Sequence, residues 1–218
     1  AKFELVDALG KDGIAILNLD DERIKKSSQK YNLKKEFYSV KSRTDLFATN
    51  LSEDPNGLEF NLHYQNKIYP VKTKILGLQN VGNILAAFLA GINLGMRLEE
   101  LLKEVGTLKL PPSTMEKKFS KNGAILIDDT YNINPNGVKF SVDTLAIFKG
   151  FKKILVLSPM LELGRNSQNL HKEVVDYALK KVDLLIWIGA DFMNFIKKLS
   201  VKRQKIVVFN SYNKAKEF

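Results

Sequence analysis

Hydrophobic and polar positions along the chain follow two different periods, and these periods divide it into strand-like and helix-like segments. Residues 1–9 show a helical pattern, and Ile14 to Leu17 form an apolar run typical of a buried strand. Residues 36–50 and 57–74 alternate between apolar and polar side chains, as half-buried strands do. The sequence Asp54-Pro55-Asn56-Gly57 between them is typical of a hairpin turn, so we expect an antiparallel flap.

A helical period replaces this alternation from about Asn80 to Leu94. Its apolar side chains recur at the spacing that lines one helix face: Val81, Ile84, Leu85, Phe88, Leu89 and Ile92. A shorter helix is expected from about Arg97 to Val105, and Pro111-Pro112 after it predicts a hinge. We therefore expect one domain over residues 1–111 and a second over 112–218.

Strand and helix patterns alternate through the second part of the chain. The expected strands lie at about 124–128, 153–158, 184–189 and 205–210, and the expected helices at about 136–148, 168–182, 191–199 and from 212 onward. This alternation is typical of a parallel sheet covered by helices, so the predicted fold class is α/β with a Rossmann-like second domain. No Gly-x-Gly-x-x-Gly follows the first of these strands, so the dinucleotide fingerprint is absent.

The composition of the chain excludes several kinds of functional site. The chain has no cysteine, which excludes disulfides, thiolate metal sites and cysteine nucleophiles. Its two histidines, His63 and His171, are too far apart in sequence to indicate a histidine metal cluster. No apolar run is long enough to cross a bilayer and no signal peptide leads the chain, so we expect a cytoplasmic protein without membrane insertion.

The net charge of +10 raises the question of nucleic-acid binding. The lysines are dispersed in pairs near the ends of apolar segments, and they form no basic stripe interleaved with aromatic residues. This distribution favours a lysine-rich surface, which would attract an anionic small substrate, over a nucleic-acid site.

One polar run stands out: Asp128-Asp129-Thr130-Tyr131-Asn132, followed by Ile133-Asn134-Pro135. It comes after the apolar strand candidate 124–127 and before a predicted helix. Open α/β sheets bind ligands where their parallel strands end, and two adjacent acids need compensating cations or donors. The same residues are also typical of a polar turn that caps the next helix, so both interpretations remain open.

Five short motifs occur in order along the chain: Ala1-Lys2-x-Glu4-Leu5, Asp12-Gly13-x-Ala15-Ile16-Leu17-Asn18-x-Asp20-Asp21, Gly77-x-x-Asn80-x-x-Asn83-x-x-Ala86-Ala87, Asp128-Asp129-Thr130-Tyr131-Asn132-x-Asn134-Pro135 and Met160-Leu161-Glu162-Leu163-Gly164. In this order and spacing they resemble the Mur ligase family, over nearly the whole chain. The Asp-Asp-Thr-Tyr-Asn form is most similar to the members that add D-alanyl-D-alanine. Each motif alone is weak, and the five together are specific.

The resemblance implies three domains, of which this chain matches the latter half of the central ATPase domain and most of the C-terminal Rossmann-like domain. The chain starts without methionine and stops within a helical pattern, which indicates a piece of a longer protein. No Gly-x-x-x-x-Gly-Lys-Ser/Thr phosphate loop occurs in it. We therefore expect the isolated chain to be inactive as a ligase.

The implied activity is ATP-dependent amide formation in peptidoglycan precursor synthesis. UDP-N-acetylmuramoyl-tripeptide would receive D-alanyl-D-alanine through an acyl phosphate, with ATP and Mg²⁺ as cofactors. Such a reaction needs cationic groups and magnesium around the transferring phosphoryl group. The expected partners are these small molecules, without nucleic acid, and the expected state is a monomer.

The resemblance also assigns roles to individual residues. Lys2 matches a lysine that is carbamylated and helps to hold magnesium, and Asn80 and Asn83 match residues that contact adenine. Asp129 matches an acceptor for a ribose hydroxyl, and Asn132 matches a donor to phosphate oxygens. A helix-surface lysine and simple helix capping are the structural alternatives for Lys2 and for the two asparagines.

Other assignments are structural. Asp128 and Tyr131 are expected to support the site or to pack, and His171 is expected to be structural.

Three positions depart from the family pattern. Thr114 replaces an arginine expected to contact the nucleotide, Gln79 replaces a histidine, and Ser158-Pro159 replaces Gly-Asp. Three alternatives remain open: another Mur-type or folylpolyglutamate ligase, a degenerate non-catalytic binding module of the same fold, which Thr114 and the missing phosphate loop suggest, and, last, a basic nucleic-acid-binding domain. The first is disfavoured because those enzymes would carry Asp-Tyr-Ala-His or Asp-Gly-Ala-His at this loop.

Overall fold

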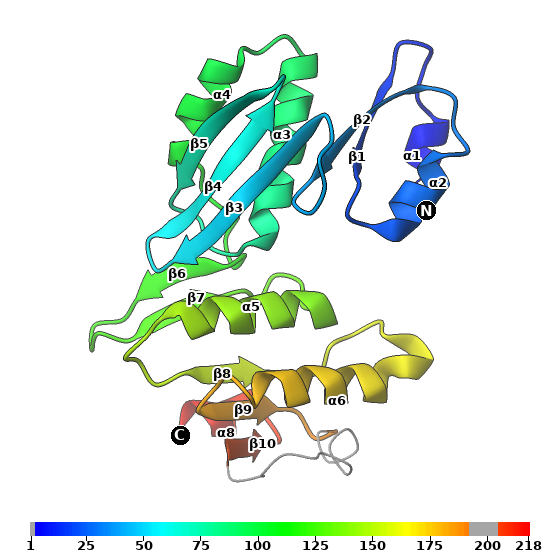
Figure 1. The fold of residues 1–218 in the computed structure, drawn as a ribbon. Coiled ribbons are helices and arrows are strands. Elements are labelled where there is room, and N and C mark those ends of the chain that lie inside the picture. The colour runs from blue at the N-terminus through cyan, green and yellow to red at the C-terminus, as the bar shows by residue number, and fades with distance from the viewer. Residues whose placement is uncertain (1–2, 192–204) are drawn as a thin grey trace. The chain divides into compact units, whose positions relative to one another are not determined.

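The computed structural model describes residues 3–191 and 205–218, and it divides into two compact units. The first unit is Ala1–Lys109 and the second is Leu110–Phe218. Each unit has its own strands and helices (Figure 1).

The first unit is a five-stranded sheet with helices. Its elements are α1 (Glu4–Asp7), β1 (Ile14–Asn18), α2 (Glu22–Ser28), β2 (Lys34–Ser39), β3 (Leu46–Asp54), β4 (Gly57–Tyr64), β5 (Lys67–Thr73), α3 (Gln79–Asn93), α4 (Leu98–Glu104) and the 3₁₀ turn η1 (Val105–Thr107). The strands follow the order β1-β2-β3-β4-β5. The first three pair in parallel and the last three pair antiparallel, so the predicted antiparallel flap is confirmed.

Alternation in the flap separates a buried face from an open one. Leu46, Ala48 and Leu62 are almost fully buried. So is the apolar stripe of α3 apart from Ile92, and α3 packs on β1, β2 and β3. Alternate side chains of a strand point to opposite faces of the sheet, so the neighbours of these residues lie on the face away from α3. The helix predicted over Asn80–Leu94 is confirmed as α3.

Two features of the first unit were missed. Residues 57–74 are two strands because Gln65 and Asn66 adopt left-handed φ values of 47° and 61° and form a second tight turn. Helix α2 lacks an apolar stripe and is started by its N-cap: Asp21 Oδ1 accepts from the backbone N–H of Arg23 at 2.8 Å and of Ile24 at 3.4 Å.

The second unit contains two sheets. Its elements are β6 (Glu116–Phe119), β7 (Ile125–Asp128), α5 (Pro135–Ile147), β8 (Ile154–Leu157), the 3₁₀ turn η2 (Gly164–Asn166), α6 (Ser167–Ala178), β9 (Leu184–Ile188), β10 (Ile206–Phe209) and α8 (Tyr212–Lys216). Strands β8, β9 and β10 pair in parallel, in the order β10-β9-β8. The α/β fold class is confirmed.

The prediction for strand β7 was wrong in one respect. We expected the acid pair to end a parallel strand, but β7 pairs antiparallel with β6, and Glu116 lies opposite Asp128. The strand β6 was missed because it is short and largely polar, Glu116-Lys117-Lys118-Phe119. The polar run therefore ends one arm of a two-stranded ribbon.

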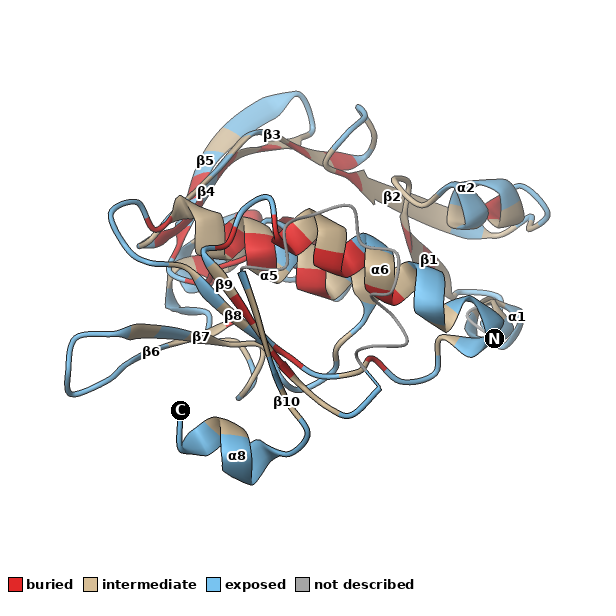
Figure 2. Ribbon diagram, turned by 90° about the horizontal axis from the view of Figure 1, so that it is seen from below, coloured by how far each residue is buried: buried red, intermediate tan, exposed pale blue. Residues whose placement is uncertain are grey.

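The core of the second unit lies between the parallel sheet and helices α5 and α6, whose buried faces are visible in Figure 2. Val142, Val175, Leu185 and Trp187 are at most 1% exposed. The predicted helix over 191–199 falls almost wholly outside the described residues. Within the described ranges, no helix is long and apolar enough to cross a membrane.

Candidate functional site

The polar run forms a short loop whose two ends are fixed by different chemistry. At its start, β7 ends at Asp128. At its end, the Asn134 side chain caps α5 by accepting from the backbone N–H of Gly137 at 2.9 Å, and Pro135 occupies the first helical turn. The predicted capping role is thus confirmed for Asn134. The cap does not involve the acids and amides before it.

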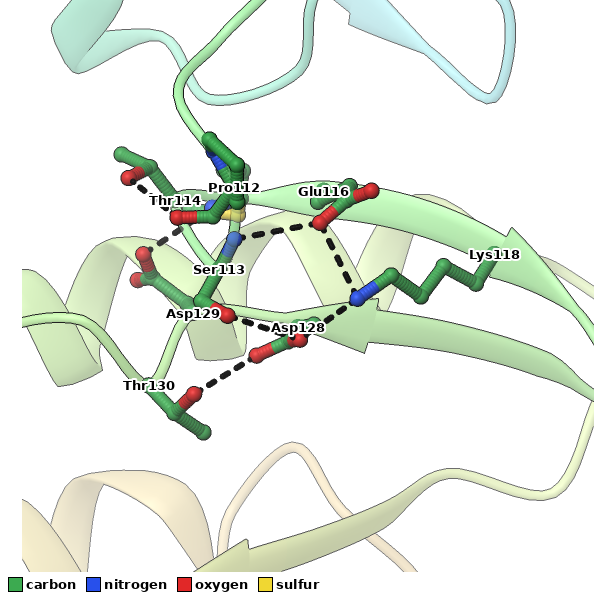
Figure 3. Close-up of polar contacts among 9 residues, drawn as sticks. Pro112, Ser113, Thr114, Glu116, Lys118, Asp128, Asp129 and Thr130 are labelled. Atoms are coloured by element: carbon green, nitrogen blue, oxygen red, sulfur yellow. Dashed lines mark hydrogen bonds and ion pairs between the residues drawn. The ribbon is translucent and has the colours of Figure 1, made fainter.

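Asp128 is the centre of a polar network (Figure 3). Its Oδ2 accepts from Lys118 Nζ at 2.8 Å and from Ser113 Oγ at 3.2 Å, while its Oδ1 accepts from Thr130 Oγ1 at 2.8 Å. Lys118 also lies 3.0 Å from Glu116 Oε2. The hydrogen bond from Lys118, followed by that from Thr130, lowers the pKa of Asp128 from 3.8 to about 2.

Asp129 is held on both of its oxygens. Oδ1 accepts from the backbone N–H of Met115 at 3.0 Å, and Oδ2 accepts from Ser141 Oγ of α5 at 2.5 Å. The carboxylate therefore joins the segment before β6 to the first turns of α5. Both acids are half-buried, whereas Thr130, Tyr131 and Asn132 are exposed.

The segment held by these acids has an unusual backbone. Ser113 and Met115 have φ values of 58° and 49°, a region that costs free energy for residues other than glycine. Besides the two contacts to the acids, Ser113 O accepts from Tyr131 N at 3.0 Å, and Ser113 N donates to Glu116 Oε2 at 3.1 Å. We call Asp128, Asp129 and the turn Ser113–Met115 the acid clamp.

A small cavity opens next to the acid clamp. Its volume is about 160 Å³, and apolar side chains of β7, β8 and α5 form most of its wall. Asp129, Thr130, Ser141 and Ser158 supply the polar part of the lining. The loop thus begins with two acids held by hydrogen bonds, Asp128 and Asp129, and continues to an exposed amide at Asn132.

The two predicted asparagines of the first unit lie together at the start of α3. Asn80 is 6% exposed; its Nδ2 donates to Leu76 O at 2.7 Å, and its Oδ1 accepts from Asn83 Nδ2 at 3.0 Å. Asn83 is exposed. The buried amide of Asn80 therefore holds the exposed amide of Asn83 near the N-terminus of α3.

Comparison with known proteins accounts for both units. Residues 1–91 match the Mur ligase middle domain, and residues 115–217 match the Mur ligase glutamate ligase domain. The chain belongs to the Mur ligase family.

Individual Mur ligases show the extent of the similarity. The UDP-N-acetylmuramoyl-tripeptide–D-alanyl-D-alanine ligase of Bacillus subtilis is 30% identical over 174 residues, which are 79% of this chain and 37% of that protein. The enzyme of the same name from Escherichia coli is 29% identical over 192 residues, 87% of this chain and 42% of that protein. This Mur ligase chain therefore spans less than half the length of these relatives.

Solved structures agree on the fold. The crystal structure of MurF from Acinetobacter baumannii superimposes with a TM-score of 0.85 at 24% identity, over 99% of this chain and 46% of that one. MurF ligase from Thermotoga maritima, solved in complex with ADP, gives 0.81 at 23% identity, over 95% of this chain and 46% of that one. These two likenesses establish the architecture of the Mur ligase domains.

The predicted site residues fall into two groups. Asn80 and Asn83 are in contact in the first unit, and Asp129 and Asn132 lie on one loop of the second. Lys2 lies outside the described residues. Among those that are described, no group of three His, Cys, Asp or Glu side chains could hold a metal ion.

Sequence reasoning missed the side chains that surround the acids: Ser113, Lys118 and Ser141 donate to them, and Glu116 pairs with Lys118. One signal was available: Glu116 and Lys118 are two residues apart, so a strand there would place both on the face that meets Asp128.

His171 is structural, as expected. It is 1% exposed, its Nε2 accepts from Met160 N at 2.8 Å, and its Nδ1 lies 2.7 Å from Ser167 O. It fixes the start of the Met160–Gly164 motif to α6.

Proposed function

We propose that this chain is part of an ATP-dependent ligase that adds D-alanyl-D-alanine to UDP-N-acetylmuramoyl-tripeptide, in the synthesis of peptidoglycan precursors. The observation that carries the proposal is similarity, across both domains, to relatives named for that reaction in Bacillus subtilis and Escherichia coli. The Asp128–Asn132 loop has the form typical of this branch of the family.

The proposed chemistry has two steps. The terminal carboxylate of the tripeptide attacks the γ-phosphorus of ATP, which gives an acyl phosphate and ADP. The amine of D-alanyl-D-alanine then displaces phosphate and forms the amide. Catalysis of such steps consists mainly of positioning and of stabilising charge on the phosphoryl oxygens.

In the second unit, Asp129 and Asn132 are proposed to meet the nucleotide and the acyl phosphate. Each Asp129 oxygen already accepts one hydrogen bond, and an ionised carboxylate has about four acceptor positions, so a ribose hydroxyl can still donate to it. Asn132 is exposed and can donate its amide hydrogens to phosphate oxygens. The acid clamp supports this role by fixing the loop before any ligand binds.

In the first unit, Asn83 is proposed to contact adenine, and Asn80 to orient Asn83. A carboxamide can accept from adenine N6 and donate to N7 at the same time. The contact between Asn80 and Asn83 occupies one amide hydrogen of Asn83, and Asn83 is exposed.

Magnesium is proposed on the resemblance of Lys2 to the carbamylated lysine of the family. The described residues do not supply a metal site by themselves, so Mg²⁺ would depend on Lys2 and on the phosphates of the nucleotide. We further propose that the protein acts in the cytoplasm as a monomer on small anionic substrates, which its charge of +10 would attract.

The proposal can be tested by restoring the part of the enzyme that the chain does not span. The part of the Bacillus subtilis relative that this chain does not match would be fused to this chain. We expect phosphate release that requires ATP, UDP-N-acetylmuramoyl-tripeptide and D-alanyl-D-alanine together, and that is lost in Lys2→Ala but retained in Lys11→Ala. A folded fusion protein that binds ADP but releases no phosphate would favour the non-catalytic module.

A further inference from the structure

The amino ends of the parallel strands in the second unit carry a dense group of lysines. The segments that lead into β8, β9 and β10 are residues 149–153, residues 179–183 and Lys205. Because these strands are neighbours in the order β10-β9-β8, and neighbouring strands lie about 5 Å apart, their starts fall within about 10 Å of one another. We call Phe151 and the six lysines of these segments the basic edge: Lys149, Lys152, Lys153, Lys180, Lys181 and Lys205.

Hydrogen bonds join the three segments of the basic edge. Lys153 O accepts from Asp183 N at 2.9 Å and from Leu184 N at 3.2 Å, and Lys153 N donates to Asp183 Oδ2 at 2.7 Å. Lys205 Nζ donates to Val182 O at 3.1 Å. The lysines therefore lie on one continuous surface, although they are far apart in the sequence.

Acids neutralise only part of this positive charge. Asp143 of α5 pairs with Lys181. Lys149, Lys152 and Lys180 are exposed, and in the part of the chain that the structure describes they form no ion pair. At least these three ammonium groups are left for an external anion.

Two structural explanations do not account for these lysines. The first is pairing with acids of α6, but Glu173 already pairs with Lys139, and Asp176 already pairs with Lys172. The second is compensation of helix dipoles at the ends of α5 and α6. Neither helix has a basic residue in its last turn, and the effect of the dipole falls off within that turn.

One aromatic side chain projects from the basic edge. Phe151 is 50% exposed, and Gly150 before it has a φ of 80° and lies in open space, where an added Cβ would meet no atom within 4 Å. The turn between α5 and β8 is therefore a projecting tip, with Lys149 and Lys152 on either side of Phe151. An aromatic ring with lysines beside it is typical of protein segments that lie at a membrane surface.

The basic edge and the candidate loop lie at opposite ends of β8. The cavity next to the acid clamp is lined by Asp129 and Thr130, which follow β7, and by Leu157 and Ser158 at the carboxyl end of β8. The basic edge is at the amino end of the same strand, and a strand of four residues spans about 13 Å. A flat surface bound to the basic edge therefore leaves the loop open.

We propose that the basic edge adsorbs to an anionic membrane surface, with Phe151 at the level of the lipid headgroups and the lysines on the headgroup phosphates. Lysine is a flexible point charge that suits a fluid array of phosphates, and the basic edge has no arginine to hold one phosphate at two points. A single-stranded nucleic acid fits less well, because its bases stack on successive aromatic rings and the basic edge has one. The proposal does not rest on the ligase activity.

Sedimentation with lipid vesicles tests the proposal. The chain would be mixed, at about 0.1 M NaCl, with vesicles of equal parts phosphatidylglycerol and phosphatidylcholine, or of phosphatidylcholine alone. We expect the chain to sediment with the mixed vesicles and not with phosphatidylcholine, and to bind less as the salt concentration rises. Equal binding to both kinds of vesicle would contradict an electrostatic contact.

Matched double variants locate the surface. Lys149→Gln/Lys152→Gln should weaken vesicle binding about 25-fold, because each lysine near an anionic surface contributes about fivefold. Lys26→Gln/Lys30→Gln removes the same charge from exposed positions of the first unit and should weaken binding less than about threefold. Equal losses in the two double variants would show that net charge alone drives binding, and the proposal would fall.

Phe151→Ser measures the apolar part of the contact. It should weaken binding about fivefold at every salt concentration, because salt does not screen an apolar contact. The fluorescence of Trp187, which is buried in the second unit, reports whether each variant is folded. If Phe151→Ser were unfolded, the lysine variants, which change exposed side chains, would decide the matter.

A single-stranded DNA oligonucleotide provides the competing outcome. It would be offered to the chain and to both double variants under the same conditions as the vesicles. If the chain bound the oligonucleotide through Lys149 and Lys152 and did not sediment with the mixed vesicles, the basic edge would be a nucleic-acid site and the proposal would be overturned.

Discussion

The acid after β1 and the acid pair at the end of β7 perform the same structural task with different partners. In the first unit, Asp20 accepts from the neutral donors Ser39 and Val40 and anchors an ordinary loop. In the second, Asp128 and Asp129 anchor a turn with left-handed φ values and include a lysine among their partners. In both places the conspicuous acids work as structural anchors, each accepting hydrogen bonds from a neighbouring segment of the chain.

The comparison predicts the largest loss for Asp129→Ala. This change removes the acceptor of Met115 N and Ser141 Oγ and leaves a strained turn without support, so the free energy of unfolding should fall by about 2–4 kcal/mol. Trp187, the one tryptophan of the chain, is buried in the second unit, and its fluorescence during urea unfolding reports the loss. Glu217→Ala is the control. If both variants unfolded at the same urea concentration, the acid clamp would not stabilise the second unit.

Asp20→Ala should cost less, about 1–3 kcal/mol, because it removes two hydrogen bonds from a loop without left-handed residues at its anchor. The readout is thermal unfolding followed by the ring signals of His63, which lies in the same unit. Asp12→Ala, an exposed acid before β1, provides the comparison. If Asp20→Ala destabilised the chain more than Asp129→Ala, strain would not distinguish the two anchors.

Ser113 allows the strain itself to be measured. Ser113→Ala loses the hydrogen bond to Asp128 and keeps a residue with a side chain at φ 58°, whereas Ser113→Gly loses the same bond and relieves the strain. The alanine variant should therefore be less stable than the glycine variant by about 1 kcal/mol in urea unfolding followed by Trp187. Equal stabilities would show that the left-handed turn costs nothing here.

The smallest effect on stability is expected for Lys118→Gln, whose main consequence is on the pKa of Asp128. The folded-state pKa of Asp128, about 2, is below its ordinary value of 3.8, so its contribution to stability is complete above pH 3.8 and is lost as the pH falls toward 2. In Lys118→Gln the pKa should rise toward 3.8, and the loss should begin at a higher pH. An NMR titration of the Asp128 carboxyl carbon measures this pKa, with Lys121→Gln as the control. If the pKa of Asp128 were unchanged in Lys118→Gln, Lys118 would not be the cause of its low value.

Periodicity revealed most of the fold. The spacing of apolar residues predicted the stripe of α3, the flap hairpin at Asp54–Gly57 and the parallel strands β8 to β10. Tertiary contacts do not override this spacing in any of the three. Helix α2 was missed because its start depends on one capping side chain, Asp21, and not on an apolar face. Strand β6 was missed because pairing with β7, a non-local contact, decides its conformation.

The position of the candidate loop was predictable from the sequence, and its hydrogen-bonding arrangement was less so. The motif located the loop at Asp128–Asn132, but no sequence rule predicts left-handed φ values at Ser113 and Met115, because neither is glycine, asparagine or aspartate. The burial of Asn80 was not predictable from the sequence either, because amphipathic spacing does not predict that its amide will donate to Leu76 O.

The most direct test of the assignment is the identity of the amine that the restored enzyme accepts. The fusion protein would be supplied with ATP and offered two substrate pairs: UDP-N-acetylmuramoyl-tripeptide with D-alanyl-D-alanine, and UDP-N-acetylmuramate with L-alanine, the pair named for a relative 27% identical over 186 residues. Mass spectrometry of the products should find the nucleotide pentapeptide and little or no alanyl product. The reverse outcome would contradict the account and move the chain to another branch of the family.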